Sequence, residues 1–401
     1  MAALKYWLWL SQLPRVNNQM KLALLNHFNG ELDSLYHADR AEYMLVEGMT
    51  RSAAEALENK DLGGADKILG DCDRLGLQIM TIQDSAYPYR LRNIYNPPIV
   101  LYARGRKIPQ MDDEVAIAMV GSRRVSAYGM EMGEKLAYRL ASQGAVIVSG
   151  LAAGGDACAH RGALRAGGFT VAVIGGGHDI VYPKENRLLY EDIAVKGLIL
   201  SEYPPGTEHR GGHFPVRNRI ISGLCLATVV IEAPLASGTL ITANHALEQG
   251  RDVFAIPGHM DDSHCAGSNR LLRDGAGVIT DVWDILNHYV GQYPHKIRDV
   301  RYGEARRFGG GEEEKAPPPQ EKKQAAPALP VLDLAGEHGL SGDQVQILRA
   351  LNGRTVQLDD LIDETQIPTQ RVLSALTMLQ LEQRVNEESG KRFSLAVILE
   401  N

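Results

Sequence analysis

Four regions of the chain differ in how their hydrophobic and polar positions alternate. Residues 1 to about 70 place hydrophobic side chains at helical spacing and carry almost no strand pattern, which predicts several short helices. The segment 47–50 separates two of these helices, and Thr50 is expected to cap the helix that runs to Leu57. A glycine-containing turn between short helices is typical of SAM-like and helix-hairpin-helix domains. Such domains hold DNA phosphates in some proteins and serve only for packing in others.

The second region, from about 112 to 290, alternates short apolar runs with amphipathic segments. Its apolar runs predict strands at 116–120, 145–149, 169–174, 227–232 and 253–256. Its amphipathic segments predict helices at 128–143, 156–166 and 239–248. Strands this apolar are buried on both faces, so the pattern predicts an α/β fold with a parallel sheet between two helical layers. Ligands of such sheets bind beyond the carboxyl ends of the strands.

The last two regions are a linker and a small domain. Residues 303 to about 338 contain triplets of glycine, glutamate and proline, a composition that cannot form a core. Beyond it, helices are predicted at 343–351, 358–364 and 369–381, followed by a hairpin at 384–395. Three helices and a hairpin describe a winged helix. The expected domains are therefore 1–75, 76–290, a linker at 291–339, and 340–401.

Composition narrows the classes of function. A length of 401 residues predicts more than one domain, and the net charge of −7 means that any nucleic-acid site is a local basic patch. The four cysteines form no Cys-x-x-Cys pair, so neither a zinc ribbon nor a disulfide framework is expected. No apolar run reaches 18 residues, and the apolar N-terminus reads as a helix and not as a signal peptide. We therefore expect a cytoplasmic protein without a membrane span.

The first central strand ends in the turn Gly121-Ser122-Arg123-Arg124. A dinucleotide site needs Gly-x-Gly-x-x-Gly at this point, and no Walker A segment exists elsewhere, so no nucleotide cofactor is expected. The turn instead places two arginines and a hydroxyl before a helix N-terminus, which suits phosphate groups. The alternative is that these arginines form ion pairs within the turn.

Three later segments add polar and cationic side chains. The segment 182–186 carries Lys184 and Asn186, and the segment Ser237-Gly238-Thr239 opens a helix that could bind an anion. The segment 209–219 is expected to be a loop with cations around an aromatic ring, namely Arg210, Phe214, Arg217, Asn218 and Arg219. Single-stranded DNA is bound by cations that follow its backbone and by rings that stack on its bases. Alternatively, Phe214 is a core aromatic, and one of the two arginines at 217 and 219 holds the loop.

Asp156 and His160 stand four residues apart on a predicted helix, so their side chains can touch. Such a pair can act as a general base, but no nucleophile is obvious beside it. A hydrogen bond that stabilises the helix is the simpler interpretation.

Together these segments resemble the DprA/Smf family of DNA-processing proteins, and the resemblance covers nearly the whole chain. The matching segments occur in the family's order: 121–123, 149–152 with Gly155, Asp156 and His160, 182–183 with Asn186, 214–223, 237–243, and 255–258.

The resemblance implies a SAM-like domain, an extended Rossmann-like core and a winged helix. It also implies a non-catalytic protein that binds incoming single-stranded DNA, protects it, and loads RecA recombinase during natural transformation. Family members typically dimerise through the Rossmann-like domain, so a homodimer is expected, with neither a cofactor nor a metal site. The residues expected to bind DNA are Gly121, Ser122, Arg123, Lys184, Asn186, Arg210, Phe214, Arg217, Asn218, Arg219, Ser237, Gly238 and Thr239.

Two segments bear on other functions, hydrolysis and transcription regulation. The segment 234–242 distantly resembles the signature of lysine-decarboxylase-like phosphoribohydrolases, but Thr242 stands where that signature has its glutamate. A transcription regulator would read duplex DNA with its winged helix, yet residues 343–401 hold nine acidic and six basic residues, a balance of −3. We expect this domain to bind a protein or to regulate, with weak DNA contact through Lys391 and Arg392 as the alternative.

Overall fold

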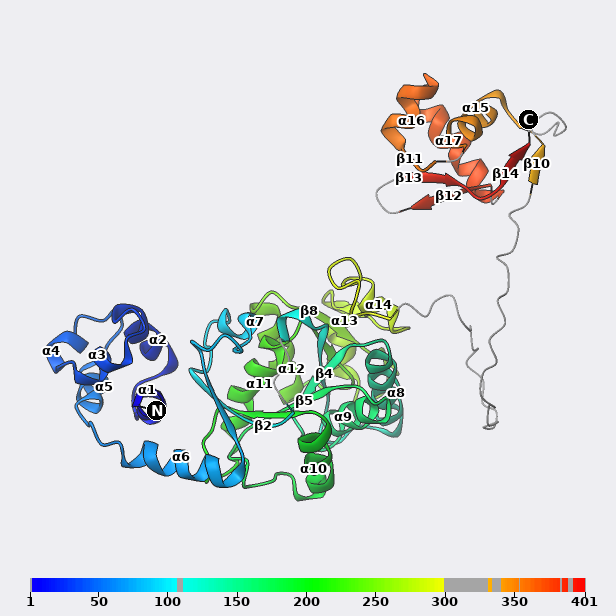
Figure 1. Cartoon of the computed structure of the whole chain (residues 1–401). Coiled ribbons are helices and arrows are strands. Elements are labelled where there is room, and N and C mark those ends of the chain that lie inside the picture. Colours follow the sequence, from blue (N-terminus) through cyan, green and yellow to red (C-terminus); the bar gives the residue numbers. More distant parts are fainter. Residues whose placement is uncertain are drawn as a thin grey trace, which may run out of the picture. The chain divides into compact units, whose positions relative to one another are not determined.

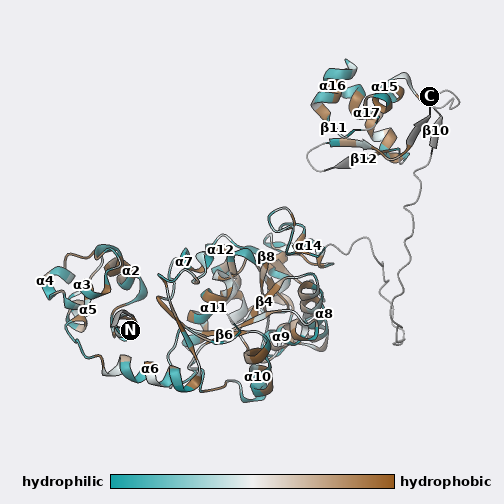
Figure 2. Cartoon of the chain, viewed as in Figure 1, coloured by the Kyte–Doolittle hydropathy of each residue, from teal (hydrophilic) through white to brown (hydrophobic). Residues whose placement is uncertain are grey.

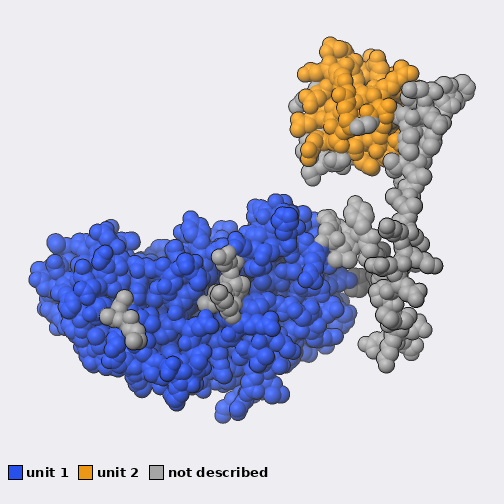
Figure 3. Space-filling view, in the orientation of Figure 1, with its two compact units in different colours: residues 1–307 blue, residues 308–401 orange. Residues whose placement is uncertain are grey.

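The computed structural model describes residues 2–106, 111–298, 331–333, 340–352, 354–382, 384–388 and 392–400. The chain forms two compact units, residues 1–307 and 308–401, which are blue and orange in Figure 3. The glycine, glutamate and proline triplets of the predicted linker lie outside the described residues. No described helix is long and apolar enough to cross a membrane.

The N-terminal part of the first unit is helical, as the hydrophobic spacing predicts. Polar caps fix the helix starts: Thr50 accepts a hydrogen bond from the Ala53 N–H, and Asp39 forms a reciprocal capping box with Glu42. The helices are α1 (Ala2–Gln12), α2 (Asn18–His27), α3 (Leu32–His37), α4 (Arg40–Tyr43), α5 (Arg51–Leu57) and α6 (Gly63–Leu75), shown in blue in Figure 1. Thr50 is therefore confirmed as a helix cap.

A nine-stranded sheet forms the centre of the first unit, in the order β1-β2-β6-β5-β4-β3-β7-β8-β9. Seven neighbouring strands are parallel, and at one edge β2 runs antiparallel to both of its neighbours, β6 and β1. The strands are β1 (Gln78–Thr81), β2 (Val100–Gly105), β3 (Ala116–Val120), β4 (Val146–Ser149), β5 (Thr170–Ile174), β6 (Leu198–Ser201), β7 (Ala227–Val230), β8 (Asp252–Ala255) and β9 (Gly277–Val278). The parallel sheet is confirmed; the antiparallel edge is an addition to the prediction.

Helices cover both faces of this sheet, because its strands are apolar on both sides (Figure 2). One face packs against α8 (Ala127–Ser142), α9 (Gly155–Arg165) and α10 (Arg187–Lys196). The other face packs against α11 (His213–Gly223) and α12 (Gly238–Glu248). Shorter elements complete the unit: α7 (Tyr89–Arg92), α13 (Ala266–Arg273), α14 (Trp283–Leu286), and the 3-10 turns η1 (Met111–Asp113) and η2 (Lys184–Asn186). The result is the predicted Rossmann-like fold.

The order of the strands creates a switch point beside β3. The chain runs from β3 outward through β4, β5 and β6, and then returns to place β7 and β8 on the other side of β3. The connections after β3 and β7 therefore leave the sheet on opposite faces and open a crevice at its carboxyl edge.

The second unit has its own core and the elements of a winged helix. Its helices are α15 (Gly342–Ala350), α16 (Leu358–Thr365) and α17 (Thr369–Leu381), with the short strand β11 (Val356–Gln357) and the hairpin β12 (Val385–Glu388) and β13 (Arg392–Leu395). The strands β10 (Val331–Asp333) and β14 (Ile398–Glu400) form a separate parallel pair. The three predicted helices and the hairpin are confirmed to within one residue or so at each end.

One local prediction is wrong: the segment 209–219 is not a loop throughout. The helix α11 begins at His213, so Phe214, Arg217 and Arg219 lie on a helix. Pro215 is tolerated because it lies in the first turn, where its missing N–H costs no intrahelical bond. The helical pattern is hidden in the sequence because the buried face of α11 includes two arginines in place of apolar side chains.

Candidate nucleic-acid interface

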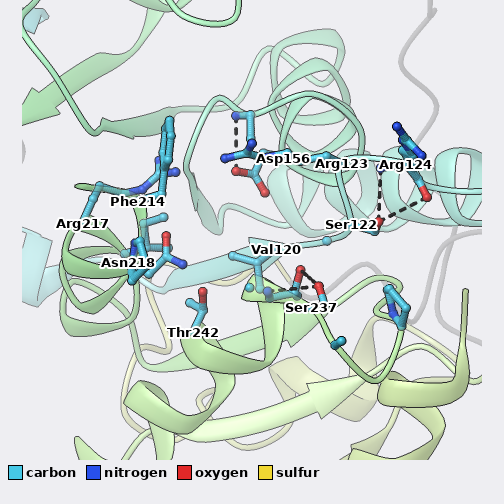
Figure 4. A pocket seen from close by; sticks show the side chains of 18 of the residues that line it. Val120, Ser122, Arg123, Arg124, Asp156, Phe214, Arg217, Asn218, Ser237 and Thr242 are labelled. Atoms are coloured by element: carbon cyan, nitrogen blue, oxygen red, sulfur yellow. Dashed lines mark hydrogen bonds between the residues drawn. The ribbon is translucent and has the colours of Figure 1, made fainter. Parts of the chain in front are cut away.

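A cavity of about 810 Å³ opens at the switch point. Its walls come from the turn after β3, from the first two turns of α11, and from the segment that leads into α12 (Figure 4). Residues of these three segments that line it include Gly121, Ser122, Arg123, Arg124, Phe214, Arg217, Asn218, Ser237, Gly238, Thr239 and Thr242. Nine of the thirteen residues expected to bind DNA therefore meet at one place.

Backbone contacts hold the turn after β3 in place. The Ser122 N–H donates to the Glu232 carbonyl, and the Ser122 carbonyl accepts from the Gly155 N–H. A Cβ on Gly155 would lie 2.5 Å from the Gly121 Cα, so only glycine allows α9 to start this close to the turn. These contacts leave Arg123 and Arg124 exposed, and among the described residues neither forms an ion pair. The arginines are thus available to an anion.

Aromatic rings stand beside these cations. The Arg123 guanidinium lies 4.7 Å from the centre of the Phe214 ring, within the range of a cation–π contact. The Tyr182 and His209 rings lie 5.6 Å and 6.4 Å from the Phe214 ring and stack on each other at 5.5 Å. All three rings line the cavity. Phe214 thus lies on the cavity wall and is not a core aromatic.

The third wall is a helix N-terminus. The Ser237 side chain caps α12 by accepting from the Thr239 N–H, so its hydroxyl stands at the start of the helix. The first turn of a helix carries partial positive charge, which favours an anion at this end of the cavity.

A buried charge pair lies at the base of the cavity. Arg217 is buried and donates through Nη1 to the carbonyl of Gly150, which follows β4, and to that of Val173, the next-to-last residue of β5. Burial lowers the pKa of Arg217 to about 10, and the charge of Asp156 opposes this shift. Burial also raises the pKa of Asp156, against the effect of Arg217. The charged Arg217 side chain therefore links the carboxyl ends of β4 and β5.

Four of the expected residues do not line the cavity. Arg219 is buried and makes a two-pronged ion pair with Glu202, with both N–O distances at 2.8 Å. The Asn186 amide is buried and donates to the carbonyls of Leu151 and Ala152. Lys184 and Arg210 are exposed, with Arg210 3.9 Å from Glu208. We leave Arg219 and Asn186 out of the proposed interface because both side chains are already engaged inside the protein.

Asp156 and His160, which stand four residues apart on α9, each form a hydrogen bond with a different residue. The Asp156 carboxylate accepts from the Ala152 N–H, whereas His160 shares a hydrogen bond of 2.8 Å with the Thr170 hydroxyl. Burial lowers the pKa of His160 to about 3, so its imidazole is neutral at ordinary pH. His160 is therefore a buried, neutral side chain that packs inside the protein.

The cavity residues that the sequence does not predict to bind DNA include Tyr182, His209, Ser263 and His264. Tyr182 and His209 lie in the segments 182–186 and 209–219, which also carry the predicted cations. An aromatic ring near a cation is the sequence feature that could have identified both residues. Ser263 and His264 had no such signal, because they reach the cavity through a loop after β8.

Comparison with known proteins agrees with this fold. The sequence model of the family described as DNA recombination-mediator protein A matches residues 78–290, and that of the DprA winged helix domain matches residues 314–391. The DNA processing protein DprA of Bacillus subtilis is 40% identical over 238 residues, which are 59% of this chain and 78% of that protein.

One solved structure supports the same fold. The X-ray structure of DNA processing protein A from Streptococcus pneumoniae has a TM-score of 0.63 and 36% identity, over 71% of this chain and 97% of that one. A structure of DNA processing protein A from Helicobacter pylori, described for its single-stranded DNA binding mode, has a TM-score of 0.48 and 32% identity, over 54% and 97%.

The fold and the site define a Rossmann-like α/β protein with a cationic and aromatic cavity at the switch point of its sheet, joined to a winged helix. More particularly, the chain belongs to the DprA/Smf family of DNA-processing proteins.

Proposed function

We propose that this protein binds single-stranded DNA in the switch-point cavity, without chemistry. The observation that carries the proposal is the exposed Arg123 guanidinium, which has no ion pair among the described residues and lies against the Phe214 ring. Cations that meet backbone phosphates and rings that stack on bases are the two requirements for binding a single strand.

Each wall of the cavity would bind a different part of the single-stranded DNA. Arg123 and Arg124 would neutralise phosphates, the start of α12 would accept another, and Phe214 and Tyr182 would stack on bases. Lys184 and Arg210 would extend the phosphate path as exposed charges outside the cavity. A duplex would bind more weakly, because its paired bases cannot reach the rings.

The proposal includes the wider role that family membership suggests. We propose that the protein acts in the cytoplasm as a homodimer, protects incoming strands during natural transformation, and loads RecA recombinase on them. Two subunits would present two cavities and raise the affinity for a long strand by avidity. Family membership supports this wider role.

A non-catalytic role fits the chemistry of the cavity. Thr242 lines the cavity at the position where the related phosphoribohydrolase signature has a glutamate, and its hydroxyl cannot act as a carboxylate base. Asp156 does line the cavity, but its carboxylate interacts with the charge of the buried Arg217 side chain.

The test is fluorescence anisotropy with labelled single-stranded and duplex oligonucleotides. We expect the single strand to bind more tightly and Arg123→Glu to weaken that binding at least about tenfold, since charge reversal repels the phosphate. Arg123→Ala should also lower the slope of log affinity against log salt by about 0.7, the effect of one lost phosphate contact on a single strand.

Lys67→Glu is the matched control, because Lys67 is exposed on α6 and lies outside the cavity. It changes the net charge as Arg123→Glu does and should leave the affinity within about twofold, since distant exposed charges are screened by salt. Equal binding of both oligonucleotides, or equal loss in both variants, would contradict the proposal and would call for a screen of nucleotide hydrolysis.

A further inference from the structure

The loop between β8 and α13 brings a thiol and a carboxylate to a buried glutamate. Glu232 follows β7 and is 1% exposed, and Cys265 at the end of the loop is 3% exposed. Asp262, three residues earlier, is half-buried. One ligand atom from each of these three side chains lies within 4.8 Å of the other two.

Among the described residues, no lysine or arginine side chain forms an ion pair with this cluster. The Glu232 carboxylate accepts from the N–H and the hydroxyl of Ser126, and the Cys265 sulfur lies 3.5 Å from it. Among the described residues, no lysine, arginine or histidine lies within ion-pair distance of Glu232, whereas the Asp262 carboxylate contacts both the backbone N–H and the imidazole of His264. A buried carboxylate without a cation is costly, and a metal ion is one of the two usual solutions.

We propose that Glu232, Asp262 and Cys265 bind one divalent transition-metal ion of the zinc type, with water in the fourth position. A sulfur ligand beside oxygen ligands favours zinc or cobalt over magnesium or calcium, which prefer oxygen alone. The Cys265 thiol gives its proton to the solvent as the sulfur binds the ion.

The geometry needs only small movements. Zinc binds oxygen and sulfur at roughly 2.0–2.3 Å, so ligands at tetrahedral angles stand about 3.3–3.8 Å apart. Side-chain rotation can bring atoms that already lie within 4.8 Å to this separation. Each carboxylate oxygen of Glu232 can accept a second bond, so the ion need not displace Ser126. His264 bonds to Asp262 at 2.8 Å and would orient that carboxylate.

An ion at this position would link the loop after β8 to Glu232, which follows β7. The loop residues Ser263 and His264 line the switch-point cavity, so the ion would fix one of its walls. The metal site itself does not depend on what the cavity binds, and it is tested without DNA.

The experiment is a Co²⁺ titration of the metal-free full-length chain, followed by absorption in the near ultraviolet. A Co²⁺ ion bound to a thiolate gives a charge-transfer band, and we expect one equivalent to saturate it and Zn²⁺ to remove it. Cys265→Ser should abolish the band. The matched control is Cys72→Ser, which removes another buried thiol, on α6, and should leave the band unchanged.

A second variant separates ligation from folding. Asp262→Asn leaves the thiol in place and changes a half-buried loop side chain, so the circular dichroism spectrum should match that of the wild type. It should weaken Co²⁺ binding at least about tenfold. Absence of the band in the wild-type chain, its retention in Cys265→Ser, or unchanged binding in Asp262→Asn would each overturn the proposal, and none of these results bears on DNA binding.

Discussion

Phe214 is the side chain on which the stacking part of the proposed interface depends. Its ring lies on the cavity wall with the Arg123 guanidinium on one side and the Tyr182 and His209 rings nearby. A base that stacks on an aromatic ring contributes about 1–3 kcal/mol, which corresponds to roughly 5- to 150-fold in affinity.

Phe214→Leu should therefore weaken single-strand binding at least about fivefold, because leucine keeps the apolar volume and loses the flat ring. Fluorescence anisotropy measures this change. Tyr95→Leu is the control, since Tyr95 is 83% exposed and does not line the cavity. If both variants bind as the wild type does, the strand does not stack on this ring.

Buried His160 should make stability depend on pH. Its pKa is lowered from 6.5 to about 3 in the folded chain, first by burial and then by Arg217. Below pH 6.5 the unfolded chain takes up a proton that the folded chain does not bind, so the free energy of unfolding falls as the pH decreases toward 3. The loss approaches about 1.4 kcal/mol per pH unit.

Urea unfolding at pH 8, 7, 6 and 5 tests this effect in the wild type and in His160→Gln. The variant lacks the group that titrates, so its loss of stability between pH 6 and pH 5 should be smaller by about 1 kcal/mol. The two proteins should show the same pH dependence between pH 8 and pH 7. Equal slopes between pH 6 and pH 5 would show that His160 takes up its proton equally in both states.

At the scale of elements, the close contact between α9 and the turn after β3 decides where Arg123 stands. A Cβ on Gly155 would lie 2.5 Å from the Gly121 Cα, so Gly155→Ala must push the turn away from the helix. We expect a loss of about 1–3 kcal/mol in the free energy of unfolding, typical of overpacking, together with weaker binding of single strands.

Gly211→Ala is the matched control for this change. Gly211 also lines the cavity, but a Cβ there would have no atom within 4 Å. Its affinity and its urea midpoint should match those of the wild type. A Gly155→Ala variant that binds DNA normally would show that the turn can move without losing its function.

At the scale of the whole molecule, the two units have separate cores. The second unit is acidic, and the one cation of its third helix, Arg371, is held by two hydrogen bonds of 2.8 Å and 2.7 Å to Asp343. The exposed face of that helix carries Leu373, Met378 and Leu381, which suits a protein partner better than duplex DNA. Lys391, the alternative DNA contact, lies outside the described residues.

A chain that ends at residue 307 should therefore fold and keep its affinity for single strands within about twofold, because the cavity and its cations all lie in the first unit. Circular dichroism and anisotropy test this prediction. The reference is the full-length chain, whose affinity is measured at the same ionic strength. A tenfold loss on truncation would instead place part of the DNA site in the second unit.

The sequence by itself determined the layered architecture and much of the site. The strand 116–120 and the segment 171–174 are apolar throughout, which only a sheet covered on both faces can accommodate. Glycine and hydroxyl residues marked the end of a strand, as in Gly121-Ser122, where backbone must approach closely, and the start of a helix, as in Ser237-Gly238. These features are local, so the order of residues alone reveals them.

Only the tertiary structure decided which charged side chains reach the cavity. Arg123 and Arg219 look equivalent in the sequence, yet one is exposed beside an aromatic ring and the other is buried against Glu202. Likewise, the proposed metal ligand Glu232 stands 30 residues before the other two, Asp262 and Cys265, begin, and the three follow no spacing motif, because β7 and the loop after β8 meet only in the folded sheet. A side chain's partners depend on the strands and helices that fold around it, and the chain order does not contain that information in any local pattern.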